Sequence, residues 1–253
     1  MKYDLIIIGA GPCGIFTALE LKRLKPNKNI LILEKGNPIS KRICPKRKTG
    51  NCINCKPCNI TTGFAGAGAY SDGKLSLSPD VGGNLPEYLG YEKTKEMIDY
   101  VDKIYLDFGA DKKIYGIDKE KEIEKIRKKA IMSNLKLVEC PIRHIGTEKA
   151  YSIYSDIQKH LEELDVHLNF RNPVKDIIID ENNRIKGVIA DKNYYSDNVI
   201  ICVGRDGSDW LKDLCVHHGI DTKTGDVDIG VRVETRNEIM EELNEAMYES
   251  KLI

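Results

Sequence analysis

The chain has 253 residues, of which 41% are apolar and 31% are charged, a composition that is typical of a globular protein and argues against a disordered one. Lysine plus arginine equals aspartate plus glutamate at 39 each, so no overall field favours nucleic acid or an anionic membrane as a partner. No apolar run approaches the roughly 18 residues that a membrane span needs, and the N-terminus lacks the small-residue cleavage site of a signal peptide. We therefore expect a cytoplasmic protein without a membrane span and without a nucleic-acid partner.

The first 34 residues predict a strand, a glycine-rich turn, a helix and a second strand. Residues 3–8 form a continuous apolar run, which is typical of a buried parallel strand. Residues 13–25 have apolar side chains at helical spacing and stop before Pro26. Residues 30–34 are a second short apolar strand. This order of elements indicates a Rossmann-type βαβ unit at the N-terminus.

The turn in this unit, Gly9-Ala10-Gly11-Pro12-Cys13-Gly14, has the GxGxxG spacing of dinucleotide-binding proteins. Gly9 permits a tight turn, Gly11 lets the backbone approach a pyrophosphate, and Gly14 lets the helix pack closely on the strand. The N-terminus of the helix then faces the phosphates with its N–H groups. Glu34 ends the second strand 20 residues after Gly14, where a carboxylate accepts ribose hydroxyls. The alternative, a glycine-rich turn in an ordinary α/β protein, leaves Glu34 unexplained.

Residues 35–90 are rich in glycine, proline, serine, asparagine and cysteine, and an irregular stretch of this length is improbable in a compact domain unless a ligand or metal orders it. Four of the eight cysteines lie here within fifteen residues. CxxC spacing suits zinc, and CxxCxxC with a fourth cysteine suits an iron–sulfur cluster. A redox-active thiol pair and inert thiols are the alternatives. The candidate metal ligands are Cys44, Cys52, Cys55 and Cys58.

A second glycine-rich segment, GFAGAGAYSDGKL, follows at residues 63–75. Its glycines let the backbone approach a planar or anionic ligand, and Ser71 and Lys74 can donate hydrogen bonds to such a ligand. A flexible linker is the alternative, but a linker does not combine aspartate, lysine and tyrosine between its glycines. We therefore favour a ligand-binding loop.

The rest of the chain alternates helical and strand patterns. A hairpin turn is predicted at Glu181-Asn182-Asn183. Helices are predicted at 91–108, 118–133 and 148–164, after Gly207 and at the C-terminal end, and strands at 135–139, 166–170, 174–180, 184–190, 198–203 and 228–234.

The second half of this pattern resembles the FAD domain of glutathione-reductase-like flavoproteins. A strand pair at 174–190 precedes the strand 198–203 and Gly204, where those proteins have a strand that ends in a small residue and glycine. Val174 matches the position whose backbone meets the adenine. The whole chain resembles uncharacterised FAD-dependent dehydrogenases, also described as NAD(P)/FAD-dependent oxidoreductases. The shared motifs are GAGPCG, Cys-x2-Cys-x-Pro-Cys, GAGAYSDGKL, His144-Ile145-Gly146-Thr147 and Asp228-Ile229-Gly230-Val231-Arg232-Val233-Glu234.

This resemblance implies an α/β fold with a Rossmann-type FAD-binding domain, which has a parallel sheet and a β-meander, plus part of an α+β substrate domain. The FAD-binding domain is expected at 1–90 and 165–215, and the partial substrate or cap domain at 91–164 and 216–253. The family's chains are longer, and the late Gly-Asp motif of such flavoproteins has only Gly225-Asp226 as a candidate here. We therefore expect the chain to be truncated at its C-terminus. The expected cofactor-binding residues are Gly9, Gly11, Pro12, Gly14, Glu34, Lys35, Arg42, Ser71, Gly73, Lys74, Val174 and Gly204.

The implied function is that of an FAD-dependent oxidoreductase, a dehydrogenase that passes hydride or electrons through a bound flavin. NAD(P)H is a candidate electron donor, and a small molecule or a redox protein is the expected partner. A flavin-linked thiol–disulfide reductase that uses the Cys44–Cys58 cluster is a second hypothesis, and a non-catalytic, truncated nucleotide-binding fragment is a third. His144 is the candidate acid or base because imidazole titrates near neutrality. Arg143 and Lys74 are candidates for holding an anionic substrate.

Overall fold

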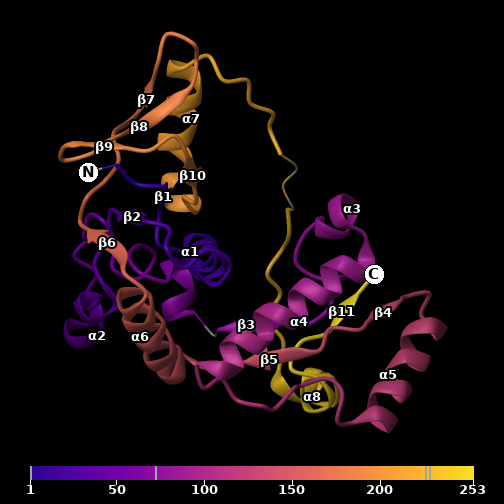
Figure 1. The fold of residues 1–253 in the computed structure, drawn as a ribbon. Coiled ribbons are helices and arrows are strands. Elements are labelled where there is room, and N and C mark those ends of the chain that lie inside the picture. Colours follow the sequence, from indigo (N-terminus) through magenta and orange to yellow (C-terminus); the bar gives the residue numbers. More distant parts are fainter. Residues whose placement is uncertain (1, 72, 226, 228) are drawn as a thin grey trace. The chain divides into compact units, whose positions relative to one another are not determined.

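The computed structural model describes residues 2–71, 73–225, 227 and 229–253 (Figure 1). The chain forms two compact units, each made of two chain segments. Unit 1 comprises Met1–Ser71 and Ala150–Gly225, and unit 2 comprises Asp72–Lys149 and Asp226–Ile253. The boundaries expected from the sequence lay at residues 90, 164 and 215, so the units divide the chain at other places.

Residues 73–90, expected in the FAD-binding domain, lie in unit 2. A second difference concerns helix α6 (Thr147–Glu163), which was expected in the cap domain but lies almost entirely in unit 1. Its contacts give the reason. The side-chain carbonyl of Gln158 accepts a hydrogen bond from the main-chain N–H of Ile39 at 3.1 Å, and Ile157 and Leu161 are fully buried. An amphipathic helix joins the unit that covers its apolar face, and the sequence pattern alone does not identify that unit.

Unit 1 is built on a four-stranded parallel sheet in the order β10-β1-β2-β6. Strand β1 lies in the middle and pairs with both β2 and β10. Every residue of β1 and β2 is buried, as expected for strands that are covered on both faces. The elements that form this layer are β1 (Leu5–Ile8), α1 (Pro12–Leu24), β2 (Ile30–Glu34), β6 (Val166–Phe170) and β10 (Val199–Ile201).

A three-stranded antiparallel meander in the order β7-β8-β9 packs with this sheet through one hydrophobic core. The core includes Ile6 and Leu33 from the sheet and Val188 from the meander. The parallel sheet and the meander confirm the α/β fold class. The elements are β7 (Asp176–Ile179), β8 (Ile185–Ile189), β9 (Asn193–Tyr195), η3 (Arg205–Gly207) and α7 (Ser208–His217).

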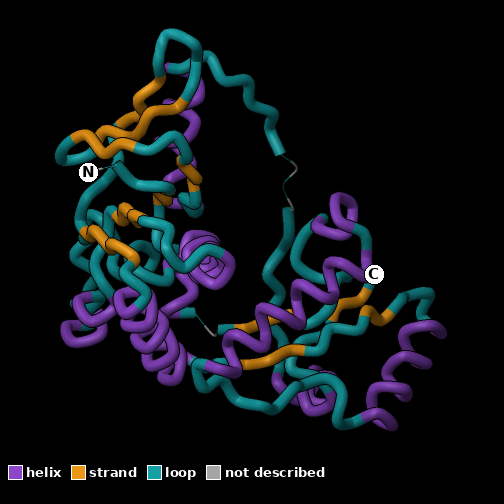
Figure 2. Tube along the Cα trace, viewed as in Figure 1, coloured by secondary structure: helices purple, strands orange, loops and turns teal. Residues whose placement is uncertain are grey.

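Between β2 and unit 2 the chain is mostly loop, drawn teal in Figure 2. The short elements on this stretch are η1 (Ile39–Lys41), α2 (Lys46–Thr49) and η2 (Gly66–Tyr70). The long irregular segment expected at 35–90 is therefore ordered over its first half by single turns of helix and by loop contacts, which are described below.

Unit 2 holds two small antiparallel sheets, β3–β5 and β4–β11. Its core cluster joins α5 to the C-terminal helix through residues such as Ile126 and Met247. The elements are β3 (Lys74–Ser76), α3 (Leu85–Leu89), α4 (Tyr91–Asp107), α5 (Glu120–Met132), β4 (Leu137–Val138), β5 (Ile142–His144), α8 (Asn237–Ala246) and β11 (Lys251–Leu252).

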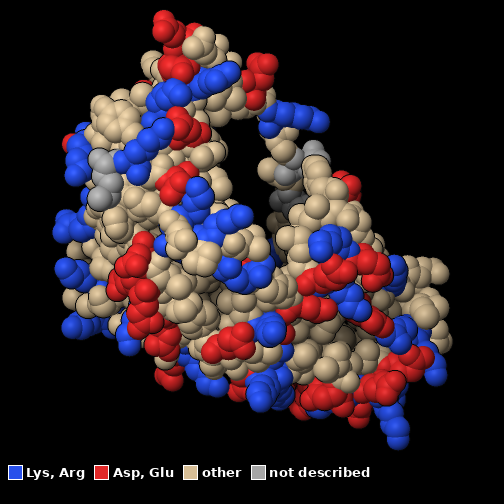
Figure 3. Space-filling view, in the orientation of Figure 1, with Lys and Arg blue, Asp and Glu red and all other residues tan. Residues whose placement is uncertain are grey.

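Two surface properties follow from the same structure. Basic and acidic side chains are interspersed over the face drawn in Figure 3, which agrees with the equal numbers of the two kinds. Over the described residues, every helix is too short or too polar to cross a membrane.

The strand predicted at 228–234 is not formed by the described residues there. Val227, Ile229, Val231 and Val233 are all at least 75% exposed. Their alternation is the pattern of a half-buried strand, but a strand also needs a neighbour for its hydrogen bonds, and in the part of the chain that the structure describes none is paired with this segment.

Candidate functional site

The predicted dinucleotide fingerprint forms the connection between β1 and α1. Gly9 has a φ of +103°, which favours glycine, and its N–H donates to the carbonyl of Leu33 at 2.8 Å. Gly11 is the N-cap of α1 and Pro12 is the first helical residue, a position that proline favours. Among the described residues, no side chain caps this helix and no acidic residue lies in its first turn. The N-terminus of α1 therefore has the polarity that attracts an anion.

The three glycines of the fingerprint differ in what surrounds them. A Cβ atom at Gly14 would lie 2.1 Å from the carbonyl oxygen of Gly9, and one at Gly9 would lie 2.6 Å from that of Cys202. Both glycines are thus required by the packing of the chain itself. A Cβ atom at Gly11 would meet nothing within 4 Å. The fold alone does not require glycine at position 11, and this fits a backbone kept bare for a ligand.

Glu34 ends β2 beside this turn and is only 6% exposed. One carboxylate oxygen accepts a hydrogen bond from the N–H of Ala10 at 2.8 Å, and the other accepts one from Gly36 at 2.7 Å. A carboxylate has about four lone-pair sites, so two remain after these bonds. Glu34 thus fixes the turn and still has acceptor capacity for hydroxyl donors, which is the chemistry of a ribose site.

The second glycine-rich segment lies against the first. The N–H of Ala65 donates to the carbonyl of Ala10 at 2.7 Å, and a Cβ atom at Gly66 would lie 3.4 Å from the Cα of Gly11. Gly36 is more crowded, because a Cβ atom there would lie 2.5 Å from the nitrogen of Gly63. The sequence predicts both segments as ligand loops, and the structure brings residues 63–66 next to the fingerprint.

Arg42, expected to bind the cofactor, is buried and bonded to the main chain of the loop 59–66. The side chain is 2% exposed and lies 4.9 Å from the ring centre of Tyr70. Burial lowers the pKa of this guanidinium. Its N–H groups donate to the main-chain carbonyls of Asn59, Ile60, Phe64 and Gly66. Arg42 therefore holds the loop 59–66 in shape, because irregular backbone without sheet or helix partners needs other donors for its carbonyls.

A polar contact that the sequence did not reveal joins η3 to the same region. Asp206 accepts a hydrogen bond from the hydroxyl of Thr62 at 2.9 Å and forms an ion pair with Lys35 at 2.5 Å. Lys35, expected to bind the cofactor, also donates to the Asp206 carbonyl at 2.9 Å. The bonds from Lys35 and Thr62 lower the pKa of Asp206. The only sequence signal was that Asp206 follows the strand 198–203, at the carboxyl edge of the sheet.

The remaining expected cofactor residues are spread more widely. Val174 is buried in the core of unit 1, two residues after Asn172, whose N–H donates to the carbonyl of Glu34 at 3.0 Å. Gly204 caps η3, and a Cβ atom there would meet nothing within 4 Å. Ser71 ends the first segment of unit 1, whereas Gly73 and Lys74 belong to unit 2. Asp72, between them, and Asp226 of the late Gly-Asp candidate lie outside the described residues.

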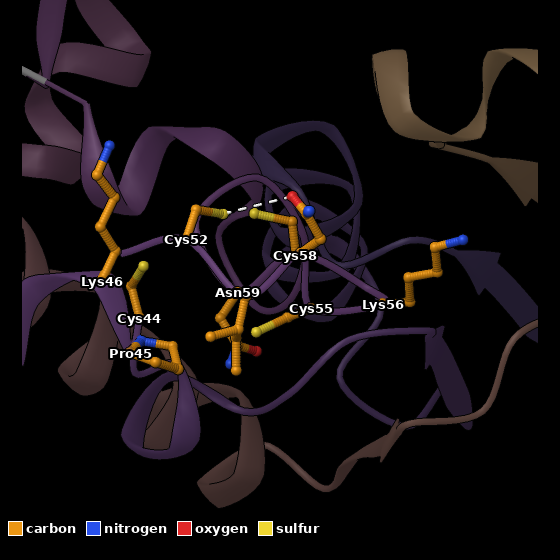
Figure 4. A pocket seen from close by; sticks show the side chains of 10 residues that line it. Cys44, Pro45, Lys46, Cys52, Cys55, Lys56, Cys58 and Asn59 are labelled. Carbon is orange, nitrogen blue, oxygen red and sulfur yellow. Dashed lines mark hydrogen bonds between the residues drawn. The ribbon is translucent and has the colours of Figure 1, made fainter. Parts of the chain in front are cut away.

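The four candidate metal ligands line one pocket but do not converge. Figure 4 shows Cys44, Cys52, Cys55 and Cys58 around this pocket of about 540 Å³. All four are free cysteines. Within the described part of the chain, no three of their sulfur atoms lie within 4.8 Å of one another, so the structure does not form the metal centre expected from the spacing. Main-chain N–H groups of Ile60 and Thr61 lower the pKa of the Cys58 thiol.

A different group of metal-binding residue types meets at the meander. Asp176 accepts a hydrogen bond from the ring nitrogen Nε2 of His218 at 2.6 Å, and Nε2 of His217 lies 3.8 Å from the other oxygen. This contact connects the start of β7 to the end of α7.

The candidate catalytic and substrate residues of unit 2 are engaged with their neighbours. His144 packs against the rings of Tyr115 and Tyr248, with ring centres 6.5 and 4.9 Å away. Arg143 is 3% exposed and forms a two-point ion pair with Asp102. Lys74 pairs with Glu249 at 2.7 Å. Arg143 is thus an internal support of unit 2 and not an open anion site, and the catalytic role of His144 stays a prediction.

A curated relative aligns with most of the chain. No family model matches the chain. An uncharacterized protein of Clostridium beijerinckii is 24% identical over 244 residues, which cover 95% of this chain and 38% of the relative. The chain therefore spans about 38% of the length of that relative.

Solved structures share the fold at low identity. L-amino acid deaminase from Proteus vulgaris aligns with a TM-score of 0.50 and 13% identity over 87% of this chain and 50% of its own. Glycine oxidase from Bacillus cereus aligns with a TM-score of 0.48 and 16% identity over 85% of this chain and 58% of its own. L-proline dehydrogenase from P. horikoshii aligns with a TM-score of 0.47 and 15% identity over 88% of this chain and 57% of its own. The deaminase match shows a common fold for most of the chain.

Proposed function

We propose that this chain is the dinucleotide-binding part of an FAD-dependent oxidoreductase. The observation that carries the proposal is the position of Gly11, whose missing side chain leaves open space at the N-terminus of α1, beside the buried carboxylate of Glu34. Pyrophosphate and ribose are the groups that this pair of features suits.

Each part of the site has a separate task in this proposal. The first turn of α1 holds the pyrophosphate, since its N–H groups point out of the helix. Glu34 accepts the ribose hydroxyls with the lone pairs that its bonds to Ala10 and Gly36 leave over. Arg42 and the loop it organises keep Gly66 against Gly11. When bound, the flavin supplies the redox chemistry, and the chain supplies binding, orientation and electrostatics.

FAD is preferred to NAD because a meander and then strand β10, with Gly204 three residues after its end, follow the βαβ unit, as in the flavoproteins that the sequence resembles. NAD(P)H is the electron donor to test first. Anaerobic addition of NADH or NADPH to the flavin-loaded chain should bleach the flavin absorbance if either nucleotide is the donor.

The central experiment measures FAD affinity of the full chain by fluorescence quenching, with NAD as a competing ligand. Gly11→Val should fold normally and lose at least about tenfold in FAD affinity, because a bulky side chain then occupies the pyrophosphate position. The matched control is Gly230→Val, since Gly230 is exposed and a Cβ atom there also meets nothing within 4 Å. Equal FAD affinity in Gly11→Val and the parent chain would refute the site. Failure of the parent chain to take up FAD would favour the non-catalytic fragment.

A further inference from the structure

Two cysteines outside the loop cluster are in direct contact. The Sγ atoms of Cys13 and Cys202 lie 3.2 Å apart, and among the described residues this is the pair of thiols in hydrogen-bonding contact. Cys13 lies in the first turn of α1, within the glycine-rich fingerprint, and is exposed. Cys202 follows β10 and is half-buried, and its N–H donates to the carbonyl of Ile8 at 2.8 Å. The two residues are 189 positions apart in the chain.

We propose that Cys13 and Cys202 form a reversible disulfide when the chain meets a small disulfide such as oxidised glutathione, and that this bond weakens dinucleotide binding. The first part stands on the contact between the two sulfur atoms. The second part rests on the proposed function, because it needs the first turn of α1 to hold the pyrophosphate.

The two thiols have different tasks in the exchange. Cys13 is the exposed sulfur, so its thiolate attacks the small disulfide after losing a proton to solvent. The S–S bond of oxidised glutathione breaks, one glutathione thiolate leaves, and a mixed disulfide forms on Cys13. Cys202 then loses its proton and attacks the Sγ atom of Cys13, which releases the second glutathione. The chain loses two electrons and two protons, and oxidised glutathione becomes two molecules of reduced glutathione.

The surroundings of Cys202 support this order. Two causes raise the pKa of the Cys202 thiol to about 12: burial is the larger one, and the hydrogen bond with Cys13 is the second. Free Cys202 is therefore a poor first nucleophile at neutral pH. Its contact with Cys13 makes it the resolving thiol, because the attack is intramolecular and needs little movement.

The bond also changes the candidate site. A disulfide has an S–S length of about 2.05 Å, so closing the present 3.2 Å separation draws the two sulfur atoms together by roughly 1 Å. Cys13 lies in the first turn of α1, so closure of the bond pulls this turn toward the end of β10, and the N–H groups that face the pyrophosphate move with it. By linkage, bound FAD should in turn slow formation of the disulfide.

Peptide mapping tests the disulfide without any flavin. The full chain, free of FAD, is treated with oxidised glutathione, quenched with iodoacetamide and digested with trypsin. Cleavage after Lys2, Lys22, Lys192 and Arg205 gives two peptides, 3–22 and 193–205, that contain one cysteine each. We expect them to be recovered as one cross-linked species that dithiothreitol separates. Recovery of both peptides alkylated, or linked instead to cysteines of the 44–58 loop, would overturn the proposal.

Single variants separate the two steps. Cys202→Ser should stop at a glutathione adduct on Cys13, and Cys13→Ser should leave Cys202 unmodified. Cys140→Ser is the control and should cross-link like the parent chain, since Cys140 lies in unit 2. FAD titration of the oxidised and reduced chains then tests the coupling, with at least a tenfold loss expected on oxidation. If the reduced chain fails to bind FAD, the proposed function fails, and the mapping result still decides the disulfide. If both forms bind FAD equally, the coupling alone is refuted.

Discussion

At the scale of single residues, Arg42 shows how a loop without regular structure is held. Its guanidinium donates to four main-chain carbonyls of the segment 59–66 and is almost completely buried. A planar group with donors in a fixed fork can meet carbonyls in several directions, and an ammonium cannot reproduce this arrangement.

We expect Arg42→Lys to lower the free energy of unfolding by about 2–4 kcal/mol, since the charge is kept but several buried carbonyls lose their donors. Urea unfolding followed by circular dichroism measures the change. Arg47→Lys is the matched control, because Arg47 is exposed and also lies over Tyr70, 5.0 Å from the ring centre. Its replacement should change stability by less than about 0.5 kcal/mol. Equal effects of the two substitutions would show that the carbonyl bonds contribute nothing specific.

Glu34 is the second residue whose exact chemistry matters. Both of its oxygens accept main-chain N–H groups, whereas an amide has only one acceptor oxygen and would turn N–H donors toward Ala10 or Gly36. We therefore expect Glu34→Gln to destabilise the chain by about 1–3 kcal/mol and to weaken FAD binding as well. Thermal unfolding measures the change in stability, and FAD titration measures the change in FAD affinity. Glu181→Gln, at an exposed position in the turn between β7 and β8, should change neither; a Glu34→Gln chain as stable as the parent would contradict this role.

At the scale of elements, Asp206 joins η3 to the loop that carries Thr62 and to the end of β2 through Lys35. The bonds from Lys35 and Thr62 lower its pKa in the folded chain. A carboxyl group with a lowered folded pKa stabilises the fold above its unfolded pKa, about 3.9, and this contribution is lost as the pH falls through the folded pKa. The expected window is therefore below about pH 4.

We expect Asp206→Asn to be less stable than the parent at pH 7 and to lose less stability than the parent between pH 5 and pH 3. The effect should be small, because half of the Asp206 side chain is exposed and solvent screens its ion pair. Urea midpoints at the two ends of this range test it, with exposed Asp209→Asn as the control. Parallel pH curves for parent and Asp206→Asn would mean that this carboxylate does not connect the elements.

The same elements show where sequence reasoning succeeds. The strand, turn, helix and strand over residues 3–34 were predicted to within a few residues, because apolar periodicity, the glycine spacing and Pro26 are all local signals. The contacts of Arg42 with the loop could not be predicted, because its partners are main-chain carbonyls, which leave no trace in side-chain patterns. The strand predicted at 228–234 is not formed by its described residues, 229–234, because alternation alone cannot supply a neighbouring strand. The cysteine spacing is compatible with a metal, but spacing does not fix where the sulfur atoms point.

At the scale of the whole molecule, each unit is assembled from two separate chain segments. The segments of unit 2 meet through the core that includes Ile126 and Met247 and through the pairing of β4 with β11. The connection from α7 to α8 differs from everything around it. Its described residues between 221 and 236 are all exposed and belong to no helix or strand (Figure 2).

This connection should be the first part of the folded chain to be cut by a protease, because cleavage needs exposed backbone without strong local structure. Trypsin at a low ratio should cut first after Lys223, Arg232 or Arg236. The loop 44–58 is the natural competitor, since it also carries exposed basic residues, but the buried Arg42 side chain anchors the adjoining backbone. Intact-mass analysis of the earliest products locates the cut. Substituting glutamine at the three sites should lengthen the lifetime of the full-length chain several-fold, and a first cut within 44–58 would contradict the prediction that the connection is cut first.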